Sequence, residues 1–106
     1  MTAVNLTVEV HCHRPIWSIN KNYPTAYRIY NNNDLLTERS WIWNNNTVIQ
    51  ENIWLYTDTD ISNVLTITPI VNIQEQAVFN LNNFTVLNHS VSTQQINDRA
   101  ISFTLQ

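Results

Sequence analysis

The stretch that decides the fold runs from Tyr27 to Thr57 and reads YRIYNNNDLLTERSWIWNNNTVIQENIWLYT. Two runs of three asparagines, Asn31–Asn33 and Asn44–Asn46, separate three segments rich in β-branched and aromatic residues. Asparagine tolerates the left-handed backbone conformations of tight turns, and such segments favour strands. The stretch therefore predicts three strands joined by two turns. Because these strands carry apolar residues on both sides, we expect them at the centre of one sheet, with the other strands added around this meander.

Further strands are predicted on both sides of the meander. Residues Val4 to Cys12 alternate apolar and polar side chains, with the apolar set, including Cys12, expected in the core. Three later strands are expected at Val64–Val71, Val78–Asn88 and Ala100–Gln106. The polar segment His89–Asp98 is predicted to be a loop.

Two positions predict local irregularities in these strands. The apolar positions change phase at Asn82–Asn83, which indicates a β-bulge or a tight turn. Pro69 has no N–H to donate, so the end of its strand should lie at an edge or a bulge. With no sustained helical period, residues 1–106 are predicted to form one all-β domain, an antiparallel β-sandwich of seven to eight strands. Its architecture is jelly-roll-like or immunoglobulin-like, and the single cysteine argues against the disulfide-bonded immunoglobulin type.

The amino-acid composition argues against some classes of binding partner. Charged residues make up 12% of the chain and its net charge is −3, so it offers no basic surface for nucleic acid. The sequence shows neither a long apolar run for a membrane span nor a signal peptide. There are 17 asparagines and no glycine, and we expect asparagine to occupy the turn positions that glycine usually takes.

Two pairs of residues are candidate metal ligands. His11 and His13 lie two apart on a strand, so both leave the same face, as in half of a zinc, iron or copper site. Asp58 and Asp60 could offer oxygens to calcium. The competing interpretations are a solvent-facing strand side for the histidines and a solvated loop for the aspartates, and both are more common than metal sites.

The aromatic residues are the candidate ligand-binding groups. The four tryptophans and the tyrosines could form a platform on which sugar rings stack while asparagine amides bond hydroxyl groups, with Trp41, Trp43, Asn45 and Trp54 as the main candidates. The alternative is that each tryptophan fills the core. Trp43, beside an asparagine turn, is the one we most expect at the surface.

Charged residues within the meander are predicted to pair. Glu38 or Glu51 with Arg28 or Arg39 would form cross-strand ion pairs, because a charge in a central strand needs a partner. We interpret these residues as structural. No spacing in the sequence fixes a pair of catalytic carboxylates, so no enzyme activity is expected.

The segment Tyr27–Trp41, with Ile49–Ile53 after it, resembles a hairpin pattern in small β-sandwich proteins of tailed phages that infect marine cyanobacteria. The pattern reads Asp-Leu-Leu-Thr-Glu-Arg and then an aromatic residue, which in this chain is Trp41 after an intervening Ser40, and later Glu-Asn-Ile. The resemblance implies a fold similar to that of calcium-dependent carbohydrate-binding modules. It also implies a protein located in the virion or in the host cytoplasm during infection. It implies no catalytic residues.

Three functional interpretations follow. The first is a non-enzymatic binding or virion-accessory module that recognises a host-surface glycan or other virion proteins, with calcium as its candidate cofactor. The second is a structural subunit that associates with copies of itself through its strand edges. The third, least favoured, is a metal-dependent enzyme built on His11 and His13.

Overall fold

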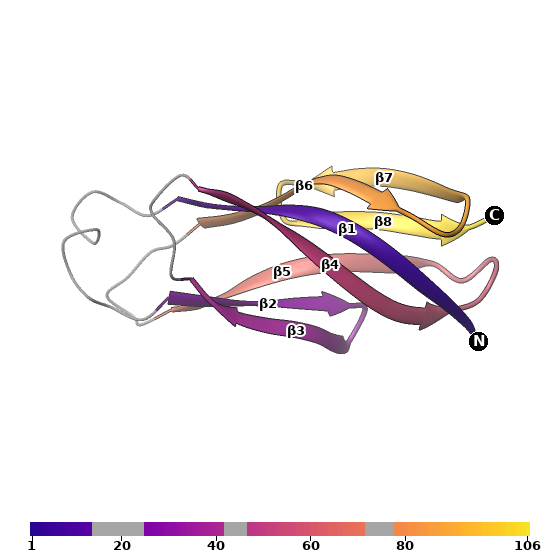
Figure 1. The fold of residues 1–106 in the computed structure, drawn as a ribbon, viewed down its shortest axis with the longest axis horizontal. Coiled ribbons are helices and arrows are strands. Elements are labelled where there is room, and N and C mark those ends of the chain that lie inside the picture. Colours follow the sequence, from indigo (N-terminus) through magenta and orange to yellow (C-terminus); the bar gives the residue numbers. More distant parts are fainter. Residues whose placement is uncertain (14–24, 42–46, 72–77) are drawn as a thin grey trace.

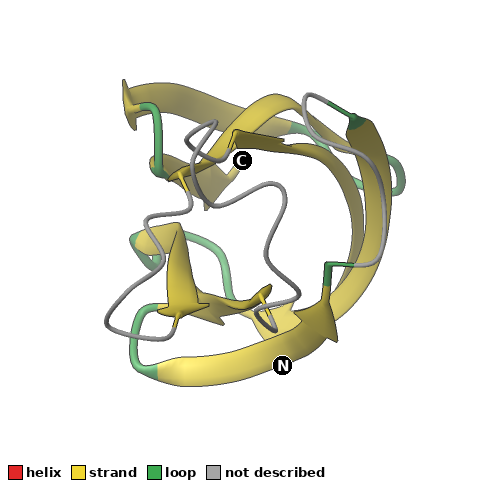
Figure 2. Cartoon of the chain, turned by 90° about the vertical axis from the view of Figure 1, so that its left-hand side faces the viewer, coloured by secondary structure: helices red, strands yellow, loops and turns green. Residues whose placement is uncertain are grey.

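The computed structural model describes residues 1–13, 25–41, 47–71 and 78–106. Eight antiparallel strands form two sheets that pack face to face as a sandwich, 46 Å long and 21 × 20 Å in cross-section (Figure 1). The end-on view in Figure 2 shows strands and loops in both layers. In the described part of the chain, no helix has the length and apolarity that a membrane span requires. The predicted all-β antiparallel sandwich is confirmed.

The smaller sheet has three strands in the order β4-β1-β6. Its strands are β4 (Val48–Thr57), β1 (Thr2–His13) and β6 (Val78–Val86). Both neighbours of β1 pair with it along most of its length, so this first strand is the centre of the sheet. β1 and β4 lie at the front of Figure 1, which therefore looks onto the outer side of this sheet.

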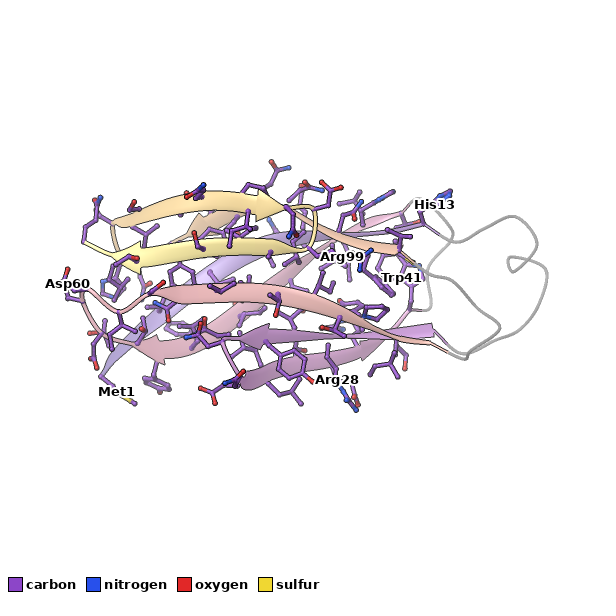
Figure 3. The ribbon with its side chains drawn as sticks, turned by 180° about the vertical axis from the view of Figure 1, so that it is seen from behind. Met1, His13, Arg28, Trp41, Asp60 and Arg99 are labelled. Carbon is purple, nitrogen blue, oxygen red and sulfur yellow. The ribbon has the colours of Figure 1, made fainter. Side chains whose placement is uncertain are left out.

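The larger sheet has five strands in the order β3-β2-β5-β8-β7. Its strands are β3 (Asp34–Ser40), β2 (Thr25–Asn31), β5 (Asn63–Val71), β8 (Ala100–Leu105) and β7 (Val91–Asn97). Figure 3 shows the molecule from this side.

The core lies between the two sheets and follows the predicted alternation. All five apolar residues of β1 from Val4 to Cys12 are completely buried, so the period of two in this strand correctly identified its inward side. From the other strands the largest fully buried side chains are Tyr27, Ile29, Leu65, Phe79, Leu81, Ile101 and Phe103.

The central meander predicted for Tyr27–Thr57 is only partly correct. β2 and β3 form the expected hairpin, and Asn32 has a positive φ of 55° at its turn. However, β4 pairs with β1 in the other sheet, and both β3 and β4 stand at the end of their sheet's strand order. The prediction of one central three-stranded unit is therefore wrong. The apolar residues on the second side of β4 are exposed, so they did not indicate burial on both sides.

The predicted irregularity at Asn82–Asn83 and the predicted edge position of Pro69 are both confirmed. β6 shifts its register against β1 around Asn83, which has a φ of 51°. Asparagine thus occupies two of the positive-φ positions in this glycine-free chain. Pro69 pairs with Tyr27 on one side, while the ladder between β5 and β8 stops at Thr66, so no strand is paired with its other side.

The loop predicted for His89–Asp98 is wrong, because Val91–Asn97 forms strand β7. Every side chain of β7 after Val91 is exposed, so the strand has no apolar alternation to reveal it. It is held by its backbone ladder with β8 at the edge of the larger sheet. Polar edge strands of this kind are compatible with solvent and weak in sequence signal.

Candidate functional site

The candidate site lies along β4 from Gln50 to Tyr56, on the outward side of the three-stranded sheet, called here the outer sheet face. This face consists of the side chains of β4, β1 and β6 that point away from the core. β4 contributes Val48, Gln50, Asn52, Trp54 and Tyr56, all exposed. β1 contributes the odd-numbered residues from Ala3 to His13. β6 contributes Val78, Asn80, Asn82 and Thr85.

Two large aromatic side chains lie next to each other on this face. Trp54 is 60% exposed and Tyr56 is 66% exposed, although both residue types are usually well covered in folded proteins. They lie two residues apart on β4, so they leave the same side at a spacing of about 6.6 Å. The pair therefore presents two aromatic surfaces in a row along one strand.

The strand next to this aromatic pair offers small and polar groups. Trp54 is the cross-strand partner of Asn5, and Tyr56 is the partner of Ala3. Ala3 has only a methyl side chain, so the sheet surface beside Tyr56 is low. The Asn5 side chain is partly buried, and its Oδ1 has no hydrogen-bond partner among the described residues.

The turn after β6, which contains Asn88 and His89, lies on the side of Ala3 opposite Tyr56. Asn88 Oδ1 accepts a hydrogen bond from Asn5 N at 2.9 Å, and Asn88 Nδ2 donates to Ala3 O at 3.1 Å. His89 Nε2 lies 3.0 Å from the same carbonyl and, since a carbonyl only accepts, it is the donor. Leu87 N also donates to Asn5 O at 2.8 Å. These bonds fix the turn against the start of β1, so Ala3 lies between Tyr56 and the turn.

Amides continue the outer sheet face beyond the aromatic pair. Asn52 lies opposite Thr7, and Gln50 lies opposite Glu9. Asn83 at the bulge donates a hydrogen bond to the Glu9 carboxylate. Glu9 is the one carboxylate at the outward positions that the structure describes, and these positions include no lysine or arginine. This face is therefore rich in neutral hydrogen-bonding groups.

The inward side of β4 carries a second polar cluster, which is buried. Glu51 is 3% exposed and accepts hydrogen bonds from the Tyr27 hydroxyl and from the Arg39 guanidinium. Burial, followed by the bond to the Glu51 carboxylate, raises the pKa of Tyr27 above its usual range. The bond to Glu51 likewise raises the pKa of Arg39. Tyr27 and Arg39 belong to the larger sheet and Glu51 to the smaller one, so this cluster joins the two layers.

The predicted cross-strand pairing is confirmed for Arg28 and Glu38, whereas Arg39 and Glu51 pair between the two sheets. Arg28 Nε lies 2.6 Å from Glu38 Oε1 across the β2–β3 hairpin, and Arg39 pairs with Glu51 between the sheets. Because Glu51 is already held by Tyr27 and Arg39, its geometry is that of a structural group.

Among the described residues, the candidate aromatic side chains divide between the core and the surface. Trp41 is 6% exposed and packs in the core against Tyr27 and Phe79, with ring centroids 6.3 and 5.8 Å away. Trp41 therefore lies in the core, which was the alternative to a position on the aromatic platform. Figure 3 shows Trp41 at the end of the molecule opposite Asp60. Trp43 and Asn45 lie outside the described residues. Of the named candidates, Trp54 is the described residue that presents an exposed aromatic ring.

The two candidate metal pairs lie far apart. His11 and His13 share the outward side of β1, as predicted, and His13 lies at the opposite end of the molecule from Asp60 (Figure 3). Asp58 Oδ1 is 3.4 Å from the amino group of Met1, and Asp60 has a φ of 68° in the following turn. Within residues 1–13, 25–41, 47–71 and 78–106, no three His, Cys, Asp or Glu side chains form a group that could hold a metal.

A groove of about 540 Å³ lies at the turn between β7 and β8, on the larger sheet. It is lined by Thr66, Ile67, Thr68, Asn97, Asp98, Arg99 and Ala100. The backbone of this turn bonds both layers: Ile67 N donates to Arg99 O at 3.0 Å, and Leu81 N donates to Asp98 O at 2.8 Å. The turn therefore has a structural role in closing the sandwich at this edge.

From the sequence, Tyr56 was included only among the tyrosines in general, and Asn52 and Gln50 were missed as members of the candidate site. Their signal was present in β4, where even-numbered positions carry amides and then aromatics, while odd-numbered positions carry the apolar core set. The contributions of Ala3 and Asn88 required the strand pairing, which no local pattern contains.

Comparisons of this chain with protein-family models, with curated proteins and with solved structures found no match. Membership of the phage-protein family suggested by the Tyr27–Trp41 pattern stays a prediction.

Proposed function

We propose that this protein is a non-enzymatic carbohydrate-binding module whose ligand lies on the outer sheet face. The observation that carries the proposal is the exposed pair Trp54 and Tyr56, side by side on β4. Exposed aromatic rings leave apolar surface in water, and covering them releases free energy. The flat C–H face of a sugar ring covers such a ring while its hydroxyl groups stay free to form hydrogen bonds.

The neighbouring polar groups suit sugar hydroxyls. An amide offers two N–H donors and a carbonyl acceptor, so it can bond to adjacent hydroxyl groups that act in both roles. Asn52 and Gln50 supply exposed amides beside the aromatic pair, on the same strand. A mostly apolar contact surface with a few oriented polar groups is typical of small-ligand sites.

The disposition of carboxylates supports a binding role. Hydrolysis of a glycosidic bond commonly uses two carboxyl groups on either side of the bond. The described outward positions offer Glu9 alone, and it is bonded to Asn83. Glu51 faces the interior, where Tyr27 and Arg39 hold it.

The biological setting follows from the resemblance of the Tyr27–Trp41 segment to phage proteins. In that setting the ligand is a glycan of the host surface, and the protein is an accessory part of the virion. The low overall charge of the chain fits recognition by stacking and hydrogen bonding, with a small electrostatic contribution.

A glycan array tests the proposal, with the protein applied once with calcium and once with EDTA. Binding is then measured by calorimetry for the wild type, for Trp54→Ala and for the control Val48→Ala. Val48 is also exposed on the outward side of β4, but it offers no ring. We expect Trp54→Ala to weaken binding at least about tenfold, as for a central contact, and Val48→Ala to leave it unchanged. Absence of binding to the array in both conditions, or equal effects of the two variants, would contradict the proposal.

A further inference from the structure

We infer that the outer sheet face takes a neutral, linear oligosaccharide that runs along β4, in preference to a single terminal sugar or an acidic glycan. This inference rests on the proposed carbohydrate-binding function and specifies its ligand class. Three observations carry it: the row of side chains on β4, the low surface between Tyr56 and the turn after β6, and the charge of the face.

The row on β4 is longer than one sugar ring needs. Gln50, Asn52, Trp54 and Tyr56 leave the same side of the strand and are all exposed. At about 3.3 Å per residue, the row spans about 20 Å. Trp54 and Tyr56 offer two separate aromatic surfaces, so at least two consecutive rings are needed to cover them. A single sugar would leave one of the two rings in water.

The surface of β1 is low at one end of this row, where Ala3 lies beside Tyr56. At the level of Tyr56, the β1 residue is Ala3, and the next element across the sheet is the turn that contains Asn88 and His89. Both turn residues are bonded to the carbonyl of Ala3, which holds the turn in place. Tyr56 and the turn therefore stand on either side of a small residue, which leaves room for a sugar ring beside Tyr56.

The charge of the face selects against acidic glycans. The three arginines that the structure describes lie on the larger sheet: Arg28 pairs with Glu38, Arg39 pairs with Glu51, and Arg99 lies in the β7–β8 turn. The described outward positions of β4, β1 and β6 thus place no lysine or arginine near a carboxylate or sulfate of a ligand. Glu9, also on this face, would repel such a group.

The order of residues along β4 predicts two kinds of subsite. The aromatic pair stacks against two rings, and Asn52 and Gln50 meet the units that follow toward the start of the strand. Removal of the Asn52 amide should therefore affect long ligands and leave a disaccharide on the aromatic pair unaffected. Asn82 provides a matched control, because it is an exposed amide on the same face but lies on β6, across β1 from the row.

The experiment measures the affinity of the wild type, Asn52→Ala and Asn82→Ala for two ligand series by calorimetry. The first series comprises neutral β-1,4-linked glucose, xylose and mannose oligomers, from the monosaccharide to the hexasaccharide. The second comprises oligogalacturonates of the same lengths. We expect the affinity for at least one neutral series to rise about tenfold or more from the monosaccharide to the tetrasaccharide. Oligogalacturonates should bind more weakly at every length. Asn52→Ala should weaken only ligands longer than the disaccharide, and Asn82→Ala should change nothing.

The outcomes separate this inference from the proposed function. Equal affinity for monosaccharide and tetrasaccharide, tighter binding of the oligogalacturonates, or equal losses in the two variants would overturn the inference, while binding itself would uphold a carbohydrate-binding module. If no oligomer binds and the glycan array is also negative, the proposed function fails, and the inference fails with it.

Discussion

The two sides of β4 both depart from the distribution of side chains that is usual in a half-buried strand. The inward side carries a buried carboxylate, Glu51, within a row of apolar residues. The outward side carries two large aromatic residues, Trp54 and Tyr56, in water. In a typical half-buried strand the charged residue would face solvent and the rings would face the core. Each reversal is unfavourable on its own, so each requires a compensating interaction.

The compensation for Glu51 lies within the molecule. The Tyr27 hydroxyl and the Arg39 guanidinium both bond to its carboxylate, and all three come from different strands. A buried charge that is paired and hydrogen-bonded is tolerated, whereas an unpaired one is costly.

The exposed rings of β4 have no such partner. Among the described aromatic contacts, the rings of Tyr27, Trp41, Phe79, Phe84 and Phe103 pair with one another in the interior, and Trp54 and Tyr56 take no part. Their compensation must therefore come from a ligand if the proposed function is correct. The comparison teaches that inward changes in β4 should alter folding stability, while outward changes should alter binding.

The largest effect is expected for Glu51→Ala. This change leaves the Tyr27 hydroxyl buried without its acceptor and the Arg39 guanidinium without its counter-charge. Because the Arg39 side chain is 46% exposed, we expect a cost of about 3 kcal/mol of unfolding free energy, at the lower end of the range for a broken buried pair. Urea unfolding monitored by circular dichroism measures the loss. The matched control is Glu38→Ala, which removes an exposed pair with Arg28 and should have a much smaller effect. Similar losses in both variants would show that the buried cluster has no special role.

A smaller effect, with a dependence on pH, is expected for Tyr27→Phe. The change removes one hydrogen bond to a carboxylate, worth about 1.5–3 kcal/mol, and keeps the ring in the core. In the wild type, burial and the bond to Glu51 raise the pKa of Tyr27. The unfolded chain therefore loses this proton above about pH 10 while the folded chain retains it, and stability falls as the pH rises through that range.

Urea unfolding between about pH 8 and about pH 11 tests this expectation, since the contribution of Tyr27 is fully present below about pH 10. Tyr27→Phe should be less stable at the lower pH and should show a shallower decline toward the higher pH. The matched control is Tyr56→Phe, which removes an exposed hydroxyl and should follow the wild type. If Tyr27→Phe and the wild type decline in parallel, Tyr27 is not the group responsible.

Of the two sides of β4, only the inward one could be identified from the sequence. The alternation of Ile49, Ile53 and Leu55 marks one inward side, and the pairing of Glu51 with Arg39 was foreseen from the need of a central charge for a partner. The exposure of Trp54 and Tyr56 was one of two open alternatives, because aromatic residues on the second side of a strand are equally compatible with a core position. Only the sheet order shows that nothing covers that side: β4 and β1 face the larger sheet with one side and solvent with the other.

Other parts of the fold show the same limit. The five buried apolar residues of β1 and the bulge at Asn83 have local signals, namely a period of two and a change of its phase. Strand β7 has none, because it is held by backbone pairing with β8 and its side chains after Val91 are all exposed and mostly polar. The turn of Asn88 and His89 against Ala3 depends on residues more than 80 positions apart in sequence, which no local pattern reveals.

The smallest effect on stability is expected for Trp54→Ala, and this small effect is itself informative. Trp54 is exposed and its neighbour Leu55 is buried, so the two residues compare the outward and inward sides at adjacent positions. Trp54→Ala should change the unfolding free energy by about 0.5 kcal/mol or less, as for most surface substitutions. Leu55→Ala should cost about 2–5 kcal/mol, because it opens a cavity in the core. Urea unfolding of both variants provides the measurement. A loss for Trp54→Ala as large as that for Leu55→Ala would mean that the outward rings contribute to folding, and the main reason to expect a ligand on this face would disappear. A negligible loss, together with weakened glycan binding, would assign the exposed rings of β4 to recognition.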